Sequence, residues 1–295
     1  MHRVKQGYVA GHDGTEIFYE SKGDGPALAF ADGIGCFGYA WKYLWDYFQP
    51  TNRLIHYHYR GHGNSAIPKD QSKLTIQNLC DDLCRIFDAD GVDKAVLFGH
   101  SMGCQVIFEF YRMFPDRCAG LVPMCGSYGH PLRTFKDSDW LEKIFPAVYT
   151  VAVLAPWATT PVWKWLVPTN LAWQVAKLTE INGHLVKKED FMPYLQDISS
   201  VPIRVFTKML DHASRHTAED ILEKIDVPTL IVAAEHDGFT PGWLSERMKQ
   251  KIPGAEMIMI PKGTHTAPIE MPDLINLRVE KFLCERLGNP KVKVA

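Results

Sequence analysis

The stretch Gly99-His100-Ser101-Met102-Gly103 lies between two runs of contrasting pattern. Residues 95–98 are continuously apolar, as in a buried strand, whereas apolar residues recur every three or four positions over residues 106–114, as on one face of a helix. Glycines two positions before and two after Ser101 leave room for a strand and a helix that cross closely. The pattern therefore predicts a strand, a sharp turn and a helix, with the serine hydroxyl exposed at the turn.

A serine hydroxyl becomes an effective nucleophile only when a base takes its proton. Ligands of open parallel sheets bind at the carboxyl ends of the strands, so we expect the base just after a strand. Two predicted strands, residues 228–234 and 256–260, are followed by polar segments. The first segment contains Asp237, with Glu235 as an alternative acid, and the second contains His265.

The rest of the chain predicts an α/β fold. Apolar or alternating runs predict eight strands, over residues 4–10, 15–21, 27–31, 53–58, 95–98, 118–124, 228–234 and 256–260. Helical periodicity between them predicts a mostly parallel eight-stranded sheet with helices on both faces. The alternation stops over residues 128–216, which hold five of the eight tryptophans. We expect this segment to be a helical cap (lid) inserted into a core domain of residues 1–127 and 217–295.

Composition excludes several classes of function. A formal charge of −2 gives no broad attraction to nucleic acid or to anionic membranes. Seven cysteines, an odd number without C-x-x-C pairs, argue against a disulfide framework. The start of the chain, residues 1–6, has no apolar segment typical of a secretory signal. We therefore expect a cytoplasmic protein without an integral membrane segment, and a homodimer stays open.

One stretch tests the membrane question further. Residues 144–158 are almost wholly apolar, but they are too few to cross a bilayer and include Pro146 and Pro156. We expect a buried or pocket-lining segment, with a lid that lies at an interface as the alternative.

Four motifs in order resemble the α/β-hydrolase superfamily. They are the serine turn at residues 99–103, the segment Glu235-His236-Asp237 that leads to Pro241, the segment Gly263-Thr264-His265, and the turn Arg60-Gly61-His62-Gly63-Asn64-Ser65. The resemblance covers residues 8–287, with the cap at the superfamily's usual insertion point.

The resemblance implies a role for each site residue. Ser101 is expected to be the nucleophile, His265 the general base, and Asp237 the acid that orients the imidazole. The backbone N–H groups of Ile34 and Met102 are expected to hold the oxyanion. No cofactor or metal is implied, although His56 and His58 share one strand face, because no third ligand has a usable spacing.

The identity of the nucleophile narrows the chemistry. Haloalkane dehalogenases and epoxide hydrolases of this superfamily place an aspartate at the turn, whereas a serine implies an acyl-enzyme. We expect a cofactor-independent serine hydrolase that cleaves carboxylic esters or lactones of moderately hydrophobic small molecules. A C–C bond hydrolase, an acyltransferase or perhydrolase with the same triad, or a slowly hydrolysing small-molecule receptor remain alternatives.

Aromatic residues of the cap suggest an apolar pocket. Tyr149, Trp157 and Trp163 are candidate substrate contacts, together with Trp41 beside the loop that contains Ile34. Part of this aromatic set is needed for the cap's own core.

Two positions depart together from the superfamily's pattern. The loop after the third strand has Asp32-Gly33 where histidine and glycine are usual, and the fourth-strand turn begins with His58 where aspartate is usual. We hypothesise that Asp32 and His58 face each other across neighbouring strands and hold the oxyanion loop. Two unrelated polar residues are the alternative.

Overall fold

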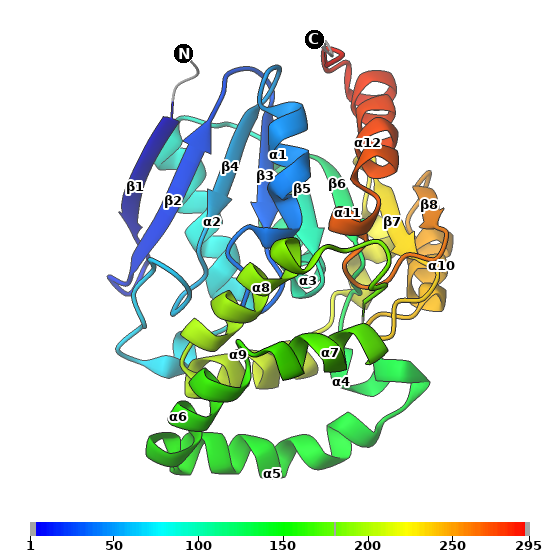
Figure 1. Ribbon diagram of the computed structural model, residues 1–295. Coiled ribbons are helices and arrows are strands. Elements are labelled where there is room, and N and C mark those ends of the chain that lie inside the picture. Colours follow the sequence, from blue (N-terminus) through cyan, green and yellow to red (C-terminus); the bar gives the residue numbers. More distant parts are fainter. Residues whose placement is uncertain (1–3, 180, 293–295) are drawn as a thin grey trace.

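The computed structural model describes residues 4–179 and 181–292 (Figure 1). Residues 1–3 and 293–295, which are the ends of the predicted core domain, and residue 180 of the predicted cap lie outside the described residues. The eight strands are β1 (Val4–Ala10), β2 (Glu16–Lys22), β3 (Ala27–Ala31), β4 (Arg53–Tyr57), β5 (Ala95–His100), β6 (Cys118–Met124), β7 (Leu230–Ala234) and β8 (Glu256–Ile260).

The strands form one sheet in the order β1-β2-β4-β3-β5-β6-β7-β8. The pairs β1–β2 and β2–β4 are antiparallel, and every later pair is parallel. The central strand β5 is buried along its whole length, as its continuous apolar sequence predicts. The prediction of a mostly parallel eight-stranded sheet is therefore confirmed.

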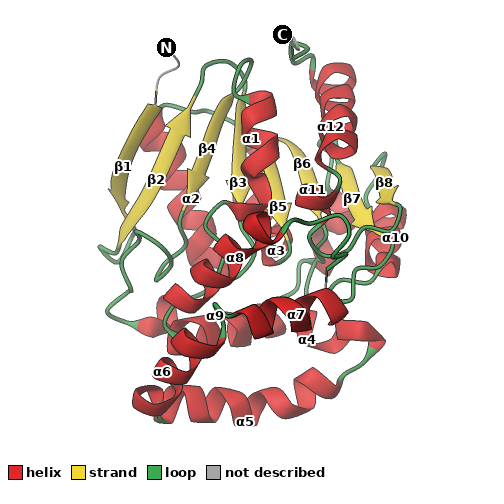
Figure 2. Cartoon of the chain, in the orientation of Figure 1, coloured by secondary structure: helices red, strands yellow, loops and turns green. Residues whose placement is uncertain are grey.

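Helices cover both faces of this sheet (Figure 2). The α-helices are α1 (Lys42–Phe48), α2 (Ile76–Asp90), α3 (Met102–Met113), α4 (Pro131–Thr134), α5 (Trp140–Leu154), α6 (Pro156–Leu166), α7 (Asn170–Thr179), α8 (Lys188–Ser200), α9 (Ile203–Arg215), α10 (Gly242–Lys251), α11 (Ala267–Glu270) and α12 (Pro272–Leu287). The short 3-10 helices are η1 (Tyr39–Trp41), η2 (Gln71–Lys73), η3 (Pro115–Arg117), η4 (Phe135–Asp137) and η5 (Glu219–Lys224).

Apolar side chains of the helices form a separate core on each face of the sheet. Leu83 and Ile86 of α2 and Phe110 of α3 are buried in one core, and Leu44 of α1 and Phe282 of α12 in the other. The helical spacing of these residues points them at the sheet. Burial of each such side chain contributes roughly 1.5–3 kcal/mol.

Helices α4–α9 fill the chain between β6 and β7 and lie across the carboxyl ends of the parallel strands (Figure 1). We call residues 128–216 the cap, and its status as a separate domain stays a prediction. Part of its aromatic content, around Trp173 and Phe191, forms a small apolar cluster that also includes Ile269 of α11, so this cluster packs the cap against the rest of the chain. The cap thereby encloses the edge of the sheet where the candidate site residues lie.

Candidate active site

Ser101 lies at a strained turn between β5 and α3. Its φ of 55° and ψ of −119° are unusual for a residue with a side chain. A Cβ atom at Gly103 would collide with the carbonyl oxygen of Ala31, and one at Gly99 with that of Gly103. Only glycine fits at these two positions, so the strand and the helix can approach closely and leave the serine partly exposed.

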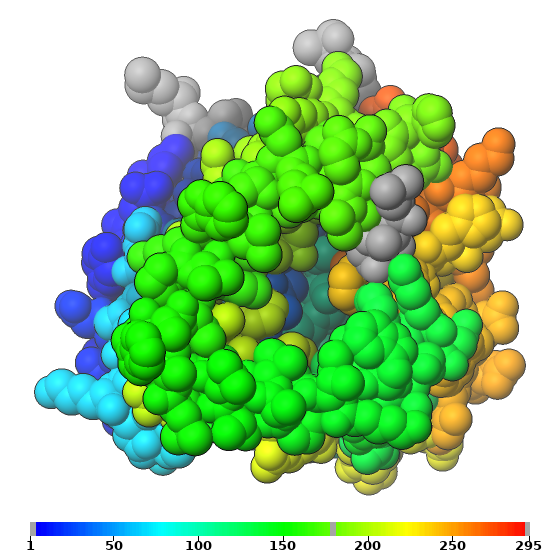
Figure 3. Space-filling model, turned by 60° about the horizontal axis from the view of Figure 1, so that its bottom comes forward, coloured from blue at the N-terminus to red at the C-terminus, as the bar shows by residue number. Residues whose placement is uncertain are grey.

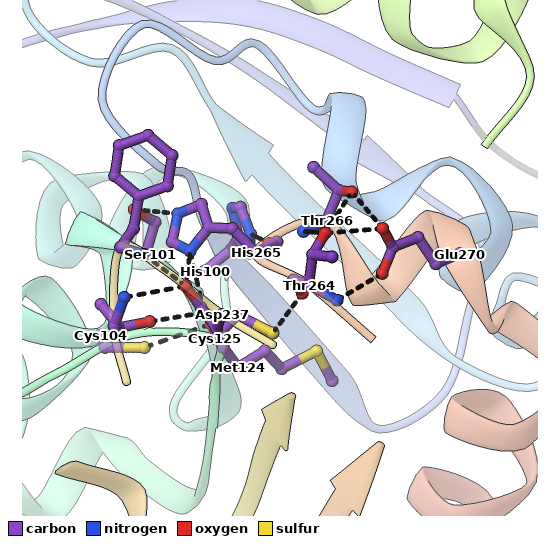
Figure 4. Close-up of polar contacts among 12 residues, drawn as sticks. His100, Ser101, Cys104, Met124, Cys125, Asp237, Thr264, His265, Thr266 and Glu270 are labelled. Atoms are coloured by element: carbon purple, nitrogen blue, oxygen red, sulfur yellow. Dashed lines mark hydrogen bonds and ion pairs between the residues drawn. The ribbon is translucent and has the colours of Figure 1, made fainter. Parts of the chain in front are cut away.

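The structure brings Ser101, His265 and Asp237 together from three distant segments (Figure 4). Ser101 Oγ lies 2.9 Å from His265 Nε2. The other ring nitrogen, Nδ1, lies 3.0 and 3.1 Å from the two carboxylate oxygens of Asp237. A carboxylate next to Nδ1 favours the tautomer with a proton there, so Nε2 is left free to accept the serine proton.

The Asp237 carboxylate is held by its own loop. Its Oδ1 atom accepts the backbone N–H of Phe239 at 2.9 Å and that of Thr240 at 2.8 Å, and its Oδ2 atom accepts the Thr240 hydroxyl at 2.7 Å. Glu235 instead accepts the backbone N–H of Lys262 at an exposed position. The geometry thus brings Asp237, and not Glu235, to the imidazole.

His100 makes a hydrogen bond to the backbone of the loop that contains His265. Its Nε2 atom lies 2.9 Å from the carbonyl oxygen of His265. Burial, and then the nearby His265, lower the pKa of His100 to about 4. His100 is therefore neutral near pH 7 and donates its Nε2–H to that carbonyl.

Glu270 holds the same loop from the other side, in a network that sequence reasoning missed (Figure 4). The buried Glu270 carboxylate accepts the N–H of Thr264 at 2.6 Å, its hydroxyl at 2.6 Å, and the hydroxyl of Thr266 at 3.0 Å. It also accepts the N–H of Asn182, a cap residue, at 3.0 Å. The acidic residue in the otherwise apolar run 267–271 was the available signal.

The loop with Ile34 is fastened through Asp32. This buried carboxylate accepts the N–H of Gly38 at 3.1 and 3.2 Å and the indole N–H of Trp41 at 2.7 Å. Its Oδ2 atom also lies 2.7 Å from Nε2 of His56. The prediction that His58 pairs with Asp32 is therefore wrong, because the partner is His56.

His58 has a different environment from His56. Its Nδ1 atom accepts the N–H of Asn64 at 2.9 Å, and its ring packs against Phe18 and Phe37. β3 ends at Ala31, so Asp32 lies beyond the strand pairing and its carboxylate is directed by the donors of Gly38 and Trp41. The loop after β3 does contact the fourth strand through an Asp–His pair, but the histidine is His56 of β4 and not His58, which follows that strand.

Ser101 opens into a cavity of about 300 Å³. Ile34 and Met102 lie on its wall, and no hydrogen bond joins the N–H of either residue to another group within residues 4–179 and 181–292. Most of the remaining lining is apolar and comes from the cap, including Leu132, Phe135, Leu141, Trp163, Phe206 and Leu210. This is a concave apolar site with a few polar groups on one side, as small-molecule sites commonly are.

Of the four expected substrate contacts, only Trp163 lies on this cavity. Trp41 is fully buried beneath the loop, where its indole binds Asp32. Trp157 is 80% exposed on the outside of the cap. Tyr149 lines a different, largely polar hollow of about 550 Å³. The structure does not place these three residues at the cavity: Asp32 holds the Trp41 indole, and helix packing in the cap turns Tyr149 and Trp157 elsewhere.

Comparison with known proteins assigns the family. The model of the alpha/beta hydrolase fold family matches residues 27–272, which is most of the chain. The chain therefore belongs to this family and is a hydrolase.

Individual relatives are distant. "Bifunctional epoxide hydrolase 2" of Mus musculus is 23% identical over 98% of this chain, and the chain spans only 57% of that protein's length. Among solved structures, the bromoperoxidase of Bacillus anthracis has a TM-score of 0.77 at 20% identity, covering 95% of this chain and 100% of that one. The enol-lactonase of Burkholderia xenovorans has a TM-score of 0.74 at 19% identity, covering 95% and 100%. At these identities the structures establish the fold alone.

Proposed function

We propose that the protein is a serine hydrolase that cleaves carboxylic esters or lactones of moderately hydrophobic small molecules. One observation carries the proposal: the hydrogen-bonded series Ser101–His265–Asp237 lies at the wall of an apolar cavity. A serine with a base and an acid in this order performs acyl transfer without a cofactor. Hydrolysis of a carboxylic ester then follows in two steps.

Acylation begins when Ser101 Oγ attacks the substrate carbonyl carbon and His265 Nε2 takes the serine proton. The negative charge that develops on the carbonyl oxygen is held by the N–H groups of Ile34 and Met102, each worth about 3–4 kcal/mol of transition-state stabilisation. Asp237 stabilises the imidazolium ion. His265 then gives its proton to the departing alkoxide, which leaves as an alcohol, or stays attached if the substrate was a lactone.

Deacylation reverses these roles with water as the nucleophile. His265 removes a proton from the water, the hydroxide attacks the acyl carbon, and the same two N–H groups hold the second oxyanion. Collapse of the intermediate breaks the bond to Ser101 Oγ, which recovers its proton from His265. The products are a carboxylic acid and the regenerated serine.

The cavity supports the proposed substrate class. Its wall is mainly apolar, with polar groups concentrated near Ser101. An apolar wall favours a hydrophobic acyl or alcohol group and offers no cation for a charged substrate. A volume of about 300 Å³ matches a small molecule rather than a polymer segment.

A fluorophosphonate probe tests the nucleophile. We expect intact-mass and peptide mass spectrometry to find one phosphonyl group, on Ser101, in the wild-type protein and none in Ser101→Ala. A panel of aryl esters, lactones and thioesters then tests the substrate class, with sustained turnover expected for esters or lactones. Labelling at another residue would refute the nucleophile assignment, and a single burst without turnover would favour a receptor.

A further inference from the structure

The outer surface of the cap is unusually apolar. On α5, Ile144, Val148, Val151 and Leu154 are 44–75% exposed, and their spacing places them on one helix face. Helices of water-soluble proteins usually turn such a face toward the core. Here only Phe145 and Ala152 of this helix are buried.

The next two helices extend this surface. Trp157 and Trp165 of α6 are 80% and 76% exposed, and Leu171 of α7 is 63% exposed. We call the whole set the apolar cap face: Trp140, Ile144, Val148, Val151, Leu154, Trp157, Val162, Trp165, Leu166 and Leu171. Exposed apolar side chains scattered singly are ordinary, but ten on three consecutive helices mark an interaction surface.

The charge around this face differs from that of the rest of the chain. The cap, residues 128–216, contains ten lysines and arginines and eight aspartates and glutamates, which is a formal charge of +2. The whole chain carries −2, so the remaining residues carry −4. Lys164 of α6 is exposed next to Trp165, so this cation is available to an anionic partner.

A second cationic group lies beside α5. The polar hollow of about 550 Å³ is lined by Tyr149 of that helix and by Lys69, Arg204, Lys208 and Arg215, with Asp70 and Asp211 as the two acidic residues. Arg204 Nε is buried without a hydrogen-bond partner among the described residues. An apolar face bordered by lysine and arginine is the pattern of proteins that lie on anionic lipid surfaces.

The apolar cap face also belongs to the helices that enclose the cavity. Leu141 of α5 and Trp163 of α6 line the cavity next to Ser101. Figure 3 shows the green cap segment around a hollow that leads inward to residues of the first strands and loops. A partner that binds this side of the cap would therefore lie next to the entrance of the cavity that contains Ser101.

We propose that the apolar cap face docks on the surface of an anionic phospholipid bilayer, with α5 and α6 lying in the interface and the core domain in water. Within residues 4–179 and 181–292, no single helix is long and apolar enough to cross a membrane. α5 and α6 qualify only as a pair, and a bend of 108° separates them. Two short helices at this angle suit insertion of tryptophan and leucine side chains to headgroup depth.

Flotation with vesicles tests the docking surface. Wild-type protein is mixed with vesicles of equal parts phosphatidylcholine and phosphatidylglycerol, and with vesicles of phosphatidylcholine alone. We expect binding to the anionic vesicles that weakens with salt. The double variant Leu154→Ser/Trp165→Ser should lower the partition coefficient about tenfold or more, because two large side chains lose their place in the bilayer.

The matched control is Tyr8→Ser/Leu277→Ser, which removes one exposed aromatic ring and one exposed leucine, 59% and 57% exposed, from the core domain. It should bind vesicles as the wild type does. Equal urea midpoints for both double variants establish that the cap variant is folded. Its turnover of a water-soluble ester should stay at the wild-type level, because neither Leu154 nor Trp165 lines the cavity.

Several results would overturn the proposal. They are the absence of flotation, flotation of the cap variant at the wild-type level, and equal binding to neutral vesicles. A concentration-dependent dimer that the cap variant abolishes, without vesicle binding, would assign the face to a second copy. The docking does not depend on the proposed chemistry, since Ser101→Ala should float like the wild type even if it turns out that Ser101 is not the nucleophile.

Discussion

Asp32 and His56 form a buried ion pair, with Asp32 Oδ2 2.7 Å from His56 Nε2. Both side chains are 2% exposed or less, and Glu20 lies 3.6 Å from the other ring nitrogen. Burial opposes a charge on His56, but the two carboxylates outweigh it and raise the pKa of His56 to about 9. The pair fastens the loop with Ile34 to strand β4, so this loop and the sheet are connected by a charged contact.

This pair predicts a pH-dependent stability. A histidine whose pKa rises on folding stabilises the native state fully below its unfolded pKa of 6.5, and the stabilisation is lost as the pH rises through about 9. We expect the wild-type free energy of unfolding to fall by roughly 3 kcal/mol over this window. His56→Gln should remove that slope and destabilise the protein at neutral pH by a similar amount. Urea titrations at several pH values measure both effects.

The control for this experiment is His184→Gln, which changes an exposed histidine of the cap. It should keep the wild-type slope. An identical slope in the wild type and in His56→Gln would contradict a charged His56.

Removal of the proposed nucleophile gives the largest expected effect. Ser101→Ala should lower kcat on an aryl ester by about six orders of magnitude, because the triad acts as a unit. The urea midpoint should not fall, since Ser101 lies at a strained, partly exposed turn. Steady-state kinetics at high enzyme concentration measure the loss, and turnover near the wild-type level would refute the assignment.

Glu270 is predicted to be a positioning residue. It accepts donors from both sides of His265 but does not itself contact Ser101. In Glu270→Gln, one carboxylate oxygen becomes an amide NH₂, which cannot accept a hydrogen bond, so either the N–H of Thr264 or the two hydroxyls that share the other oxygen lose their acceptor. We expect kcat to fall about 10- to 100-fold through misplacement of the imidazole, with KM unchanged.

The test of Glu270 separates positioning from general destabilisation. Thr266→Val removes only one of the bonds to Glu270 and should have a smaller effect on kcat. The rate of fluorophosphonate labelling should fall in parallel with kcat in both variants. A loss confined to KM, or a lower urea midpoint with unchanged kcat, would show that Glu270 acts only on substrate binding or on stability.

The catalytic candidates could be predicted from the sequence because each lies in a short, local sequence pattern. Ser101 has flanking glycines, and Asp237 and His265 directly follow strands, so sequence spacing alone brings them to one edge of the sheet. His56 could not be distinguished from His58, because the choice depends on how the chain turns after Ala31. Trp157 and Trp163 are both tryptophans of helix α6, and only the packing of that helix decides which of the two side chains faces the cavity.

Asp197 of α8 connects the cap to the loop with Ile34 and predicts a second pH effect. Burial, and then the charge of Asp32, raise the pKa of Asp197 to about 7, although the N–H of Phe37 donates to it. A carboxyl whose pKa rises on folding lowers the stability of the native state as the pH climbs from its unfolded pKa of 3.8 to about 7, and above that pH the loss stays constant. Asp197→Asn keeps the acceptor oxygen without the charge. It should therefore raise the melting temperature relative to the wild type more at about pH 8.5 than at about pH 5. Equal differences at both pH values in thermal unfolding would contradict the shifted carboxyl.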